Sequence, residues 1–330
     1  MQAVHFLGNG KIAIEEFPVP QPDEDQVLLR VMASGICGSE LHSVRSEQGS
    51  PMNGGHEVCG VIEDPNGHPQ WQKGDRVCVF TLQGCGVCRW CLAGKDTFCE
   101  NLKFMSPTHS QFCTSRARAM VPLPEDVPFE IGVLLGADGL GVPYGATMRA
   151  GVQAGDITCV FGCGPVGLGH VLVQSFLGAH VIAVEPSAAR RDLALKLGAW
   201  QVLDPTAEEN LTAKLKDLCL GVGPDKCFEC TGRQDTLDVA MDATRPEGII
   251  VVVGHGKQSI DPQKLIIKRN LTMMGNWIAH PGYYSQMLQM WRDGLPLHKL
   301  ITAVYPYQEA QKGYDEMLSG TCGKIILNWQ

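Results

Sequence analysis

The sequence predicts an α/β protein with two parts, one built on a doubly wound parallel sheet and one made mostly of short β-strands. Two observations lead to this fold class. From residue 157 to residue 254, apolar strand-like segments alternate with helical segments, as in a chain of βαβ units. Before them, the first 80 residues consist of short strand-like segments separated by glycine and proline.

The N-terminal strands come first in the chain. Strand-like segments at 3–7 and 11–17 flank Gly8-Asn9-Gly10, which is a hairpin signal. Further strands are expected at 26–34, 58–64 and 75–80, where branched and alternating residues predominate. Several short strands with turn residues between them favour a partly closed β-barrel.

A cysteine-rich segment follows these strands. Its four cysteines have the spacing C-x2-C-x2-C-x7-C and are Cys85, Cys88, Cys91 and Cys99. The alternative is four unrelated thiols in a chain with fourteen cysteines, but two consecutive C-x2-C steps argue against it. Four thiolates complete the coordination of a tetrahedral zinc ion, so a structural zinc lobe is predicted at about residues 84–100.

The segment from Ile157 to Val184 indicates a dinucleotide site. A strand at 157–161 leads into a turn with the spacing G-x-G-x-x-G, formed by Gly162, Gly164 and Gly167. Glycine there permits a tight bend, a close approach to a pyrophosphate and close packing of helix on strand. Three glycines are a weak signal in a chain with 38, so the prediction depends on the flanking strand and helix.

The flanking residues complete this candidate site. Pro165 and Val166 open the helix, whose N-terminal N–H groups suit phosphate oxygens. Glu185 ends the second strand, at 180–184, where a carboxylate can accept hydrogen bonds from ribose hydroxyls. Beyond it, helices are expected at 186–199, 207–221 and 234–244, and strands at 200–204, 226–230 and 248–254.

Composition limits the classes of partner and compartment. A net charge of −8 argues against nucleic acid and anionic membranes, because both call for a basic surface. No apolar run approaches the ~20 residues of a membrane span, and residues 1–11 lack a secretory signal pattern. We therefore expect a cytoplasmic protein whose cysteines serve metal binding rather than disulfides.

A second group of possible metal ligands is dispersed along the chain. Cys37 lies in GICGSELH, His56 and Glu57 lie in NGGHE, and Asp138 lies in LLGADGLG. Cysteine, histidine and carboxylate are all good zinc ligands, and three protein ligands with one open position make a catalytic site. From the residues alone, a structural histidine beside Gly-Gly and a turn-capping aspartate remain open alternatives.

The order of these motifs resembles a known family. GICGSELH, GHE, GDRV, the four cysteines and GCGPVG follow one another as in the zinc-dependent medium-chain dehydrogenase/reductase family, which includes alcohol, sorbitol and threonine dehydrogenases. The resemblance extends to the GKIIL segment near the C-terminus. It implies a GroES-like catalytic domain at 1–139 and 276–330, with a Rossmann domain at 140–275. It also implies two zinc ions per chain, NAD as cofactor, and a homodimer or homotetramer.

The resemblance assigns roles to the metal-binding candidates. Cys37 and His56 match ligands of the catalytic zinc. Glu57 matches a glutamate that either binds this metal or lies just behind it, and Asp138 takes a position where relatives have cysteine or glutamate. The structural zinc would be held by Cys85, Cys88, Cys91 and Cys99.

The same resemblance assigns the other site residues. Ser39 matches the hydroxyl that contacts the substrate oxygen, and His42 matches a histidine that relays its proton. Arg190 is expected near the adenosine, and Gly254 and Asn276 are expected beside the nicotinamide amide. For the last two, an ordinary sheet edge is an equally good interpretation.

The chain departs from the family pattern at three places. Glu40 stands where aspartate is usual, Gly139 stands where polyol dehydrogenases often have proline, and SPTHSQFCT lacks a glycine pair. That last segment helps to form the substrate pocket in relatives, so the substrate class is not carried over beyond a secondary alcohol, polyol or sugar.

Two other functions are compatible with part of the sequence. A threonine-type amino-alcohol dehydrogenase would need a partner for the substrate ammonium group, which the sequence does not reveal. A non-catalytic nucleotide-binding protein with only structural zinc is disfavoured, because such proteins lose the Cys, the His or the relay hydroxyl. This chain retains Cys37, Ser39, His42 and His56.

Overall fold

The computed structural model describes residues 1–50, 53–105, 107–263 and 267–330, which form two compact units. The first, here called the β unit, contains Met1–Gly141 and Ile278–Gln330, and the second, the α/β unit, contains Val142–Trp277. Within the described residues, no helix has the length and apolar character that crossing a membrane requires.

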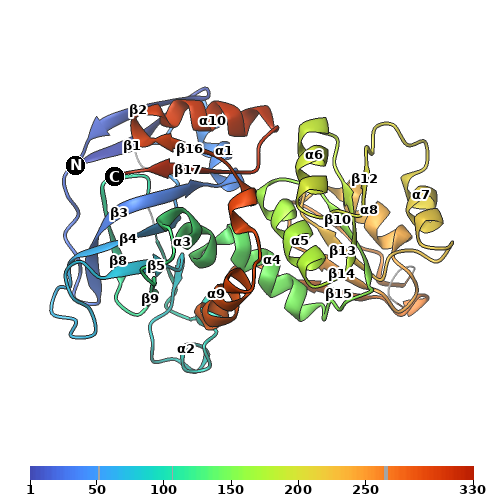
Figure 1. The fold of residues 1–330 in the computed structure, drawn as a ribbon, viewed down its shortest axis with the longest axis horizontal. Coiled ribbons are helices and arrows are strands. Elements are labelled where there is room, and N and C mark those ends of the chain that lie inside the picture. The colour runs from blue at the N-terminus through green and yellow to red at the C-terminus, as the bar shows by residue number, and fades with distance from the viewer. Residues whose placement is uncertain (51–52, 106, 264–266) are drawn as a thin grey trace. The chain divides into compact units, whose positions relative to one another are not determined.

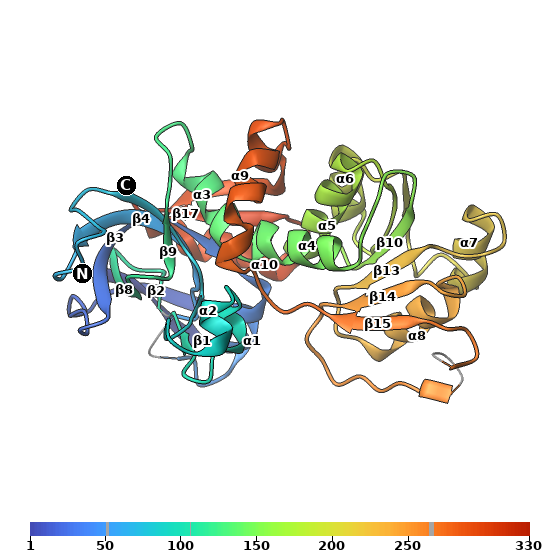
Figure 2. The same cartoon turned by 90° about the horizontal axis from the view of Figure 1, so that it is seen from below.

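The α/β unit is built on a six-stranded parallel sheet with the strand order β12-β11-β10-β13-β14-β15. Figure 2 shows β13, β14 and β15 side by side. The strands are β10 (Ile157–Phe161), β11 (His180–Val184), β12 (Gln201–Leu203), β13 (Lys226–Glu229), β14 (Ile249–Val252) and β15 (Thr272–Gly275). This is the order of a doubly wound dinucleotide-binding fold, whose ligands lie at the carboxyl ends of the strands near the reversal between β10 and β13. The predicted fold class is confirmed.

Helices cover both faces of this sheet. On one face lie α5 (Pro165–Phe176) and α6 (Ala188–Lys196), and on the other lie α7 (Leu211–Leu218) and α8 (Gln234–Ala243) (Figure 1). Helix α7 begins four residues later than the sequence predicted, because the Asn210 side chain accepts a hydrogen bond from the Ala213 N–H at 2.9 Å and caps the helix there.

The β unit contains a seven-stranded sheet centred on the long strand β3 (Gln26–Ile36). One edge of β3 pairs with β4, while its first half also pairs with β8 and its last residues with β17. The other strands are β4 (Glu57–Asp64), β5 (Arg76–Val79), β8 (Phe112–Arg116), β9 (Met120–Pro122), β16 (Ile301–Pro306) and β17 (Lys324–Asn328). A hairpin of β1 (Gln2–Gly8) and β2 (Lys11–Glu16) adds a second, smaller sheet.

Smaller elements complete the β unit. A short hairpin of β6 (Leu82–Gln83) and β7 (Lys103–Phe104) brackets the four-cysteine lobe, which contains α2 (Arg89–Leu92) and the 3-10 turn η2 (Asp96–Phe98). The other helices of this unit are α1 (Leu41–Arg45), α3 (Phe129–Gly136), α9 (Tyr284–Arg292) and α10 (Ala310–Ser319). Helix α4 (Asp138–Arg149) begins in the β unit and continues into the α/β unit. The other 3-10 turns are η1 (Gly38–Glu40), η4 (Pro281–Tyr283), η5 (Leu297–Leu300) and η6 (Tyr307–Glu309).

Strand register brings the dispersed site residues together. Gly35 pairs with Glu57, so the end of β3 and the start of β4 lie side by side, with Cys37 and His56 just beyond them. A Cβ atom at Gly35 would lie 2.7 Å from Glu57 Oε2, so only glycine fits there. On the other side of β3, Ile325 of β17 pairs with Ile36.

Candidate active site

The mixed group of candidate metal ligands converges in the β unit. Asp138 Oδ2 lies 3.5 Å from His56 Nε2 and 3.9 Å from Cys37 Sγ. Together with a carboxylate oxygen of Glu57, these ligand atoms all lie within 4.8 Å of one another. Cys37 immediately follows β3, His56 immediately precedes β4, and Asp138 is the first residue of α4.

This geometry fits a zinc ion. Zinc bonds of about 2.0–2.3 Å at tetrahedral angles separate ligand atoms by about 3.3–3.8 Å. Asp138 Oδ1 is buried and has no hydrogen-bond partner among the described residues. Burial alone would lower the pKa of His56, but hydrogen bonds and charge from Asp138 and Cys37 raise it well above its usual value. The cluster therefore favours a positive charge at its centre.

His56 is oriented toward this cluster by the backbone around it. Its Nδ1 lies 2.9 Å from the Gly54 carbonyl oxygen, which can only accept a hydrogen bond. Nδ1 therefore carries a ring proton, and Nε2 is the nitrogen that would offer its lone pair to a metal. The Thr81 hydroxyl donates to the His56 carbonyl at 2.7 Å and holds the segment against the sheet.

Glu57 lies behind the cluster in a buried ion pair. Both of its carboxylate oxygens lie 2.7 Å from Lys324 Nζ, which also donates to the Ile36 carbonyl at 3.2 Å. Burial opposes charge on Lys324, but the attraction of Glu57 outweighs it and raises the lysine pKa. Lys324 lies in the GKIIL segment, and nothing local in the sequence indicated that it pairs with Glu57.

Ser39 and His42 flank the cluster on the segment that follows Cys37. Ser39 belongs to η1 and His42 to α1, and both side chains are exposed. They are therefore accessible to a substrate and to water.

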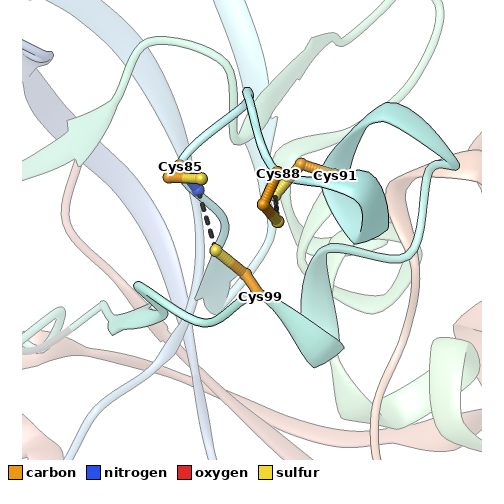
Figure 3. A group of neighbouring side chains, drawn as sticks. All are labelled: Cys85, Cys88, Cys91 and Cys99. Atoms are coloured by element: carbon orange, nitrogen blue, oxygen red, sulfur yellow. Dashed lines mark hydrogen bonds between the residues drawn. The ribbon is translucent and has the colours of Figure 1, made fainter.

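The four-cysteine lobe brings its thiols together as the spacing predicted (Figure 3). The Cys85 N–H donates to Cys99 Sγ at 3.2 Å, and Cys88 Sγ lies 3.5 Å from Cys91 Sγ. Backbone N–H groups of Val87 and Cys88 lower the pKa of Cys85 to about 6, which favours the thiolate that a metal requires. Four thiolates occupy every position of a tetrahedral ion.

The glycine turn of the α/β unit forms an anion cradle. Gly162 has a φ of +86°, and a Cβ atom at Gly167 would lie 1.8 Å from the Gly162 carbonyl oxygen. No described atom lies within 4 Å of a Cβ built on Gly164, so the turn is open at that point. Helix α5 begins at Pro165, followed by Val166, and no side chain caps its N-terminus. Its first N–H groups therefore remain available to a phosphate.

Glu185 forms hydrogen bonds within the protein that the sequence did not indicate. It is 5% exposed, its Oε2 accepts the Cys163 N–H at 2.7 Å and its Oε1 accepts the Ser187 N–H at 2.9 Å. These bonds fix the carboxylate beside the glycine turn and leave further lone pairs for a ligand. Arg191 is occupied by Asp204 at 3.0 Å and by the Glu185 carbonyl at 2.8 Å, whereas Arg190 is half-buried on the same helix.

A cavity of about 440 Å³ lies at the carboxyl end of β14 and β15. It is lined by Val252, Val253, Gly254, His255, Gly256, Gln258, Asn276 and Trp277. Gly254 and Asn276, the residues predicted to hold a nicotinamide, thus share one cavity. The Asn276 side chain is fixed by donating to the Val142 carbonyl at 3.2 Å.

The sequence did not identify a buried polar network beside Cys37. Glu40 Oε1 accepts the Cys37 N–H at 3.0 Å, and Glu40 Oε2 contacts His109 Nε2 at 3.0 Å and the Tyr314 hydroxyl at 2.6 Å. Burial alone would raise the pKa of Glu40, but charge and hydrogen bonds from His109, His56 and Tyr314 lower it. The only sequence signals were Glu40 in place of aspartate and the unusual segment that contains His109.

Comparison with known proteins agrees with this site. Residues 23–125 match the alcohol dehydrogenase GroES-like domain, and residues 165–293 match the zinc-binding dehydrogenase family. An L-threonine 3-dehydrogenase from Pyrococcus abyssi is 32% identical over 329 residues, spanning 94% of this chain and 93% of that one.

Two solved structures share the fold over 99% of both chains. The alcohol dehydrogenase TADH from Thermus sp. ATN1 has a TM-score of 0.89 at 26% identity. The 2R,3R-butanediol dehydrogenase from Bacillus subtilis has a TM-score of 0.85 at 25% identity. With the matched domains, the relatives and the two clusters of metal ligands in agreement, the chain belongs to the zinc-dependent medium-chain dehydrogenase/reductase family.

Proposed function

We propose that this protein is a zinc-dependent dehydrogenase that transfers a hydride between a secondary alcohol or polyol and NAD. One observation carries the proposal: Cys37 Sγ, His56 Nε2 and Asp138 Oδ2 lie within 4.8 Å of one another, with the second Asp138 oxygen buried and unpartnered among the described residues. The TADH and butanediol dehydrogenase structures, both named for alcohol substrates, support this class of substrate.

Each residue around the cluster would have a separate role in the reaction. A zinc ion held by Cys37, His56 and Asp138 would act as a Lewis acid toward the substrate oxygen. Ser39, two residues beyond Cys37, would hold the substrate hydroxyl and accept its proton. The exposed His42 would pass this proton to solvent. Glu57, paired with Lys324, keeps negative charge behind the ligands.

The α/β unit would supply the cofactor site. The nicotinamide ring of NAD is the hydride acceptor. The turn at 162–167 and the start of α5 would bind the pyrophosphate, and Glu185 would accept hydrogen bonds from the adenosine ribose, with Arg190 nearby. Gly254 and Asn276 line the cavity that would take the nicotinamide.

A substrate screen tests the proposal. Purified protein is mixed with NAD and, in turn, with simple secondary alcohols, vicinal diols, polyols and sugars, and the absorbance of reduced cofactor is followed. Threonine is included because the relative from Pyrococcus abyssi is a threonine 3-dehydrogenase. Turnover of threonine above all others would favour the amino-alcohol alternative, and no turnover of any alcohol by zinc-loaded protein would contradict the proposal.

The two metal sites are expected to respond differently to a chelator. The four-thiolate site is closed, whereas the mixed site keeps an open position, so a mild chelator should remove one zinc per chain and abolish activity. The fold should persist, because Arg116 holds both ends of the lobe through the carbonyls of Gln83 at 2.7 Å and Asn101 at 3.2 Å. Elemental analysis measures the zinc content, an enzyme assay measures the activity, and circular dichroism shows whether the fold persists.

Variants identify which zinc is removed. Cys37→Ala should contain one zinc per chain, whereas Cys113→Ala, which changes a buried thiol of β8 outside both clusters, should contain two. Carefully purified wild-type protein with fewer than two zinc ions per chain would contradict the prediction.

The cofactor preference is expected to favour NAD. The Glu185 carboxylate is fixed beside the glycine turn, where it would repel the 2′-phosphate of NADP. We expect kcat/KM with NAD to exceed that with NADP by roughly tenfold or more. Glu185→Ser should lower the ratio of kcat/KM with NAD to that with NADP, mainly by removing the repulsion. Glu209 is exposed, and Glu209→Ser should leave the ratio unchanged.

Equal or higher kcat/KM with NADP in the unmodified protein would mean that an arginine reaches the phosphate. Arg190 and Arg191 both lie on the helix that follows Glu185. Arg190→Ala or Arg191→Ala would then lower the activity with NADP selectively.

We also propose that the enzyme is a cytoplasmic homodimer or homotetramer that binds neither nucleic acid nor membranes. All fourteen cysteines are free thiols, which fits a reducing compartment, and the net charge of −8 does not suit anionic polymers. Analytical ultracentrifugation of the zinc-loaded protein determines the number of subunits.

A further inference from the structure

The buried Glu40 carboxylate connects the proposed metal centre to distant parts of the chain. Glu40 is 3% exposed and lies three residues after Cys37, on η1. Besides the Cys37 N–H, its carboxylate binds His109, from the segment before β8, and Tyr314, from the middle of α10. Both partners have 0% exposure, so solvent does not compete for these bonds.

The network continues from His109 in one direction. The Trp329 indole N–H donates to Ser34 Oγ at 2.9 Å, and Ser34 Oγ lies 2.7 Å from His109 Nδ1. An indole N–H can only donate and a carboxylate can only accept. His109 therefore donates from Nε2 to Glu40, while Ser34 Oγ links its Nδ1 to the Trp329 indole. Each donor polarises the next, and the series ends on Glu40.

Glu40 acts on Cys37 rather than on His56. Its Oε1 lies 3.9 Å from His56 Nδ1, which is beyond hydrogen-bond distance, and that nitrogen is bound by the Gly54 carbonyl instead. At 3.0 Å, the Cys37 N–H is the contact through which the carboxylate reaches the metal-ligand cluster. Moving this carboxylate would therefore move the backbone that carries the Cys37 thiolate.

We propose that His109 and Tyr314 are positioning residues of the metal centre, which hold the Glu40 carboxylate on the Cys37 N–H and so fix the direction of Cys37 Sγ. Neither side chain contributes an atom to the cluster of Cys37, His56, Glu57 and Asp138. The inference rests on the proposed catalytic metal centre. It assigns a role in metal binding to residues more than 70 positions away from Cys37.

The expected change in metal affinity can be estimated from other metal sites. Removing a hydrogen-bond partner from the groups that orient metal ligands typically changes metal affinity about 10- to 100-fold. A purely structural role for His109 and Tyr314 would lower stability and leave the metal affinity unchanged. Metal affinity and ligand geometry, measured without substrate, therefore distinguish the two roles.

Co²⁺ is the probe with which metal affinity and ligand geometry are measured. Zinc at the mixed site is exchanged for Co²⁺ while the four-cysteine site keeps its zinc, and the thiolate-to-cobalt absorption band and the affinity for Co²⁺ are measured by chelator competition. Tyr314→Phe should weaken Co²⁺ binding roughly tenfold and shift the band. Tyr307→Phe is the matched control, since this tyrosine of the same unit is 8% exposed and donates its hydroxyl to Gln2 outside the cluster.

Substitutions at His109 provide a second test of the proposal, again by Co²⁺ affinity. His109→Leu removes the donor to Glu40 and should weaken Co²⁺ binding, whereas His109→Gln places an amide N–H near the position of Nε2 and should restore much of it. If His109→Leu fails to fold, the Tyr314→Phe comparison still decides the question.

Two results would overturn the inference in distinguishable ways. Wild-type Co²⁺ affinity and spectrum in Tyr314→Phe, with or without a lower melting temperature, would mean that the network only stabilises the fold. Failure of the wild-type protein to take up Co²⁺ at the mixed site would instead contradict the proposed function itself.

Discussion

Ser39→Ala is expected to lower turnover by roughly 10²-fold or more, while zinc content and NAD affinity stay near those of the wild type. The hydroxyl lies two residues beyond Cys37 and is exposed, so it can reach a substrate oxygen bound at the cluster. Without it, the proton of the substrate hydroxyl has no acceptor at that position. Single-turnover measurements isolate the chemical step from product release.

Ser43→Ala is the matched control, because Ser43 lies on α1 close in sequence to Ser39 and outside the proposed relay. It should keep nearly full turnover. A wild-type rate of the chemical step in Ser39→Ala would contradict the relay, and a loss of zinc in that variant would point to a structural role instead.

Lys324→Met is expected to lower the free energy of unfolding by about 3–5 kcal/mol, because it leaves the buried Glu57 carboxylate without its partner. Glu57 is the first residue of β4 and is fully buried, so water cannot replace the lysine. Urea denaturation followed by circular dichroism measures the change.

Two further variants make this prediction specific. Adding Glu57→Gln to Lys324→Met should recover much of the lost stability, since the uncompensated charge is removed. Lys312→Met breaks the exposed ion pair with Glu309 and should change the free energy of unfolding little. Equal denaturation midpoints for Lys324→Met and Lys312→Met would contradict a stabilising role for the buried pair.

The sequence predicted the features whose signal is local. The strand, glycine turn and helix at 157–176 depend on periodicity and on residues a few positions apart, and the four-cysteine lobe depends on spacing within fifteen residues. Cys37, His56 and Asp138 needed the resemblance to a family, because only the pairing of β3 with β4 and the start of α4 bring them together.

The remaining parts of the site depend on tertiary contacts. His109, Tyr314 and Lys324 contact Glu40 or Glu57 across 69 to 274 positions, and no local pattern distinguishes them from ordinary polar residues. Helix α3 was not predicted either, because six of its eight residues are buried and it lacks the alternation of an amphipathic helix. Its neighbour α4 contains Pro143, which usually argues against a helix interior.

The discontinuous β unit also constrains how the protein folds during synthesis. Strand β17 pairs with β3 and β16, and it carries Lys324, while α10 carries Tyr314. Residues 142–277 of the α/β unit are synthesised before any of these partners. At a translation rate of 5–20 residues per second, synthesis of residues 278–330 takes roughly 3–10 s more. During that time Glu57 and Glu40 lack their lysine and tyrosine partners, so we expect the β unit to close only after Tyr314 and Lys324 have been synthesised.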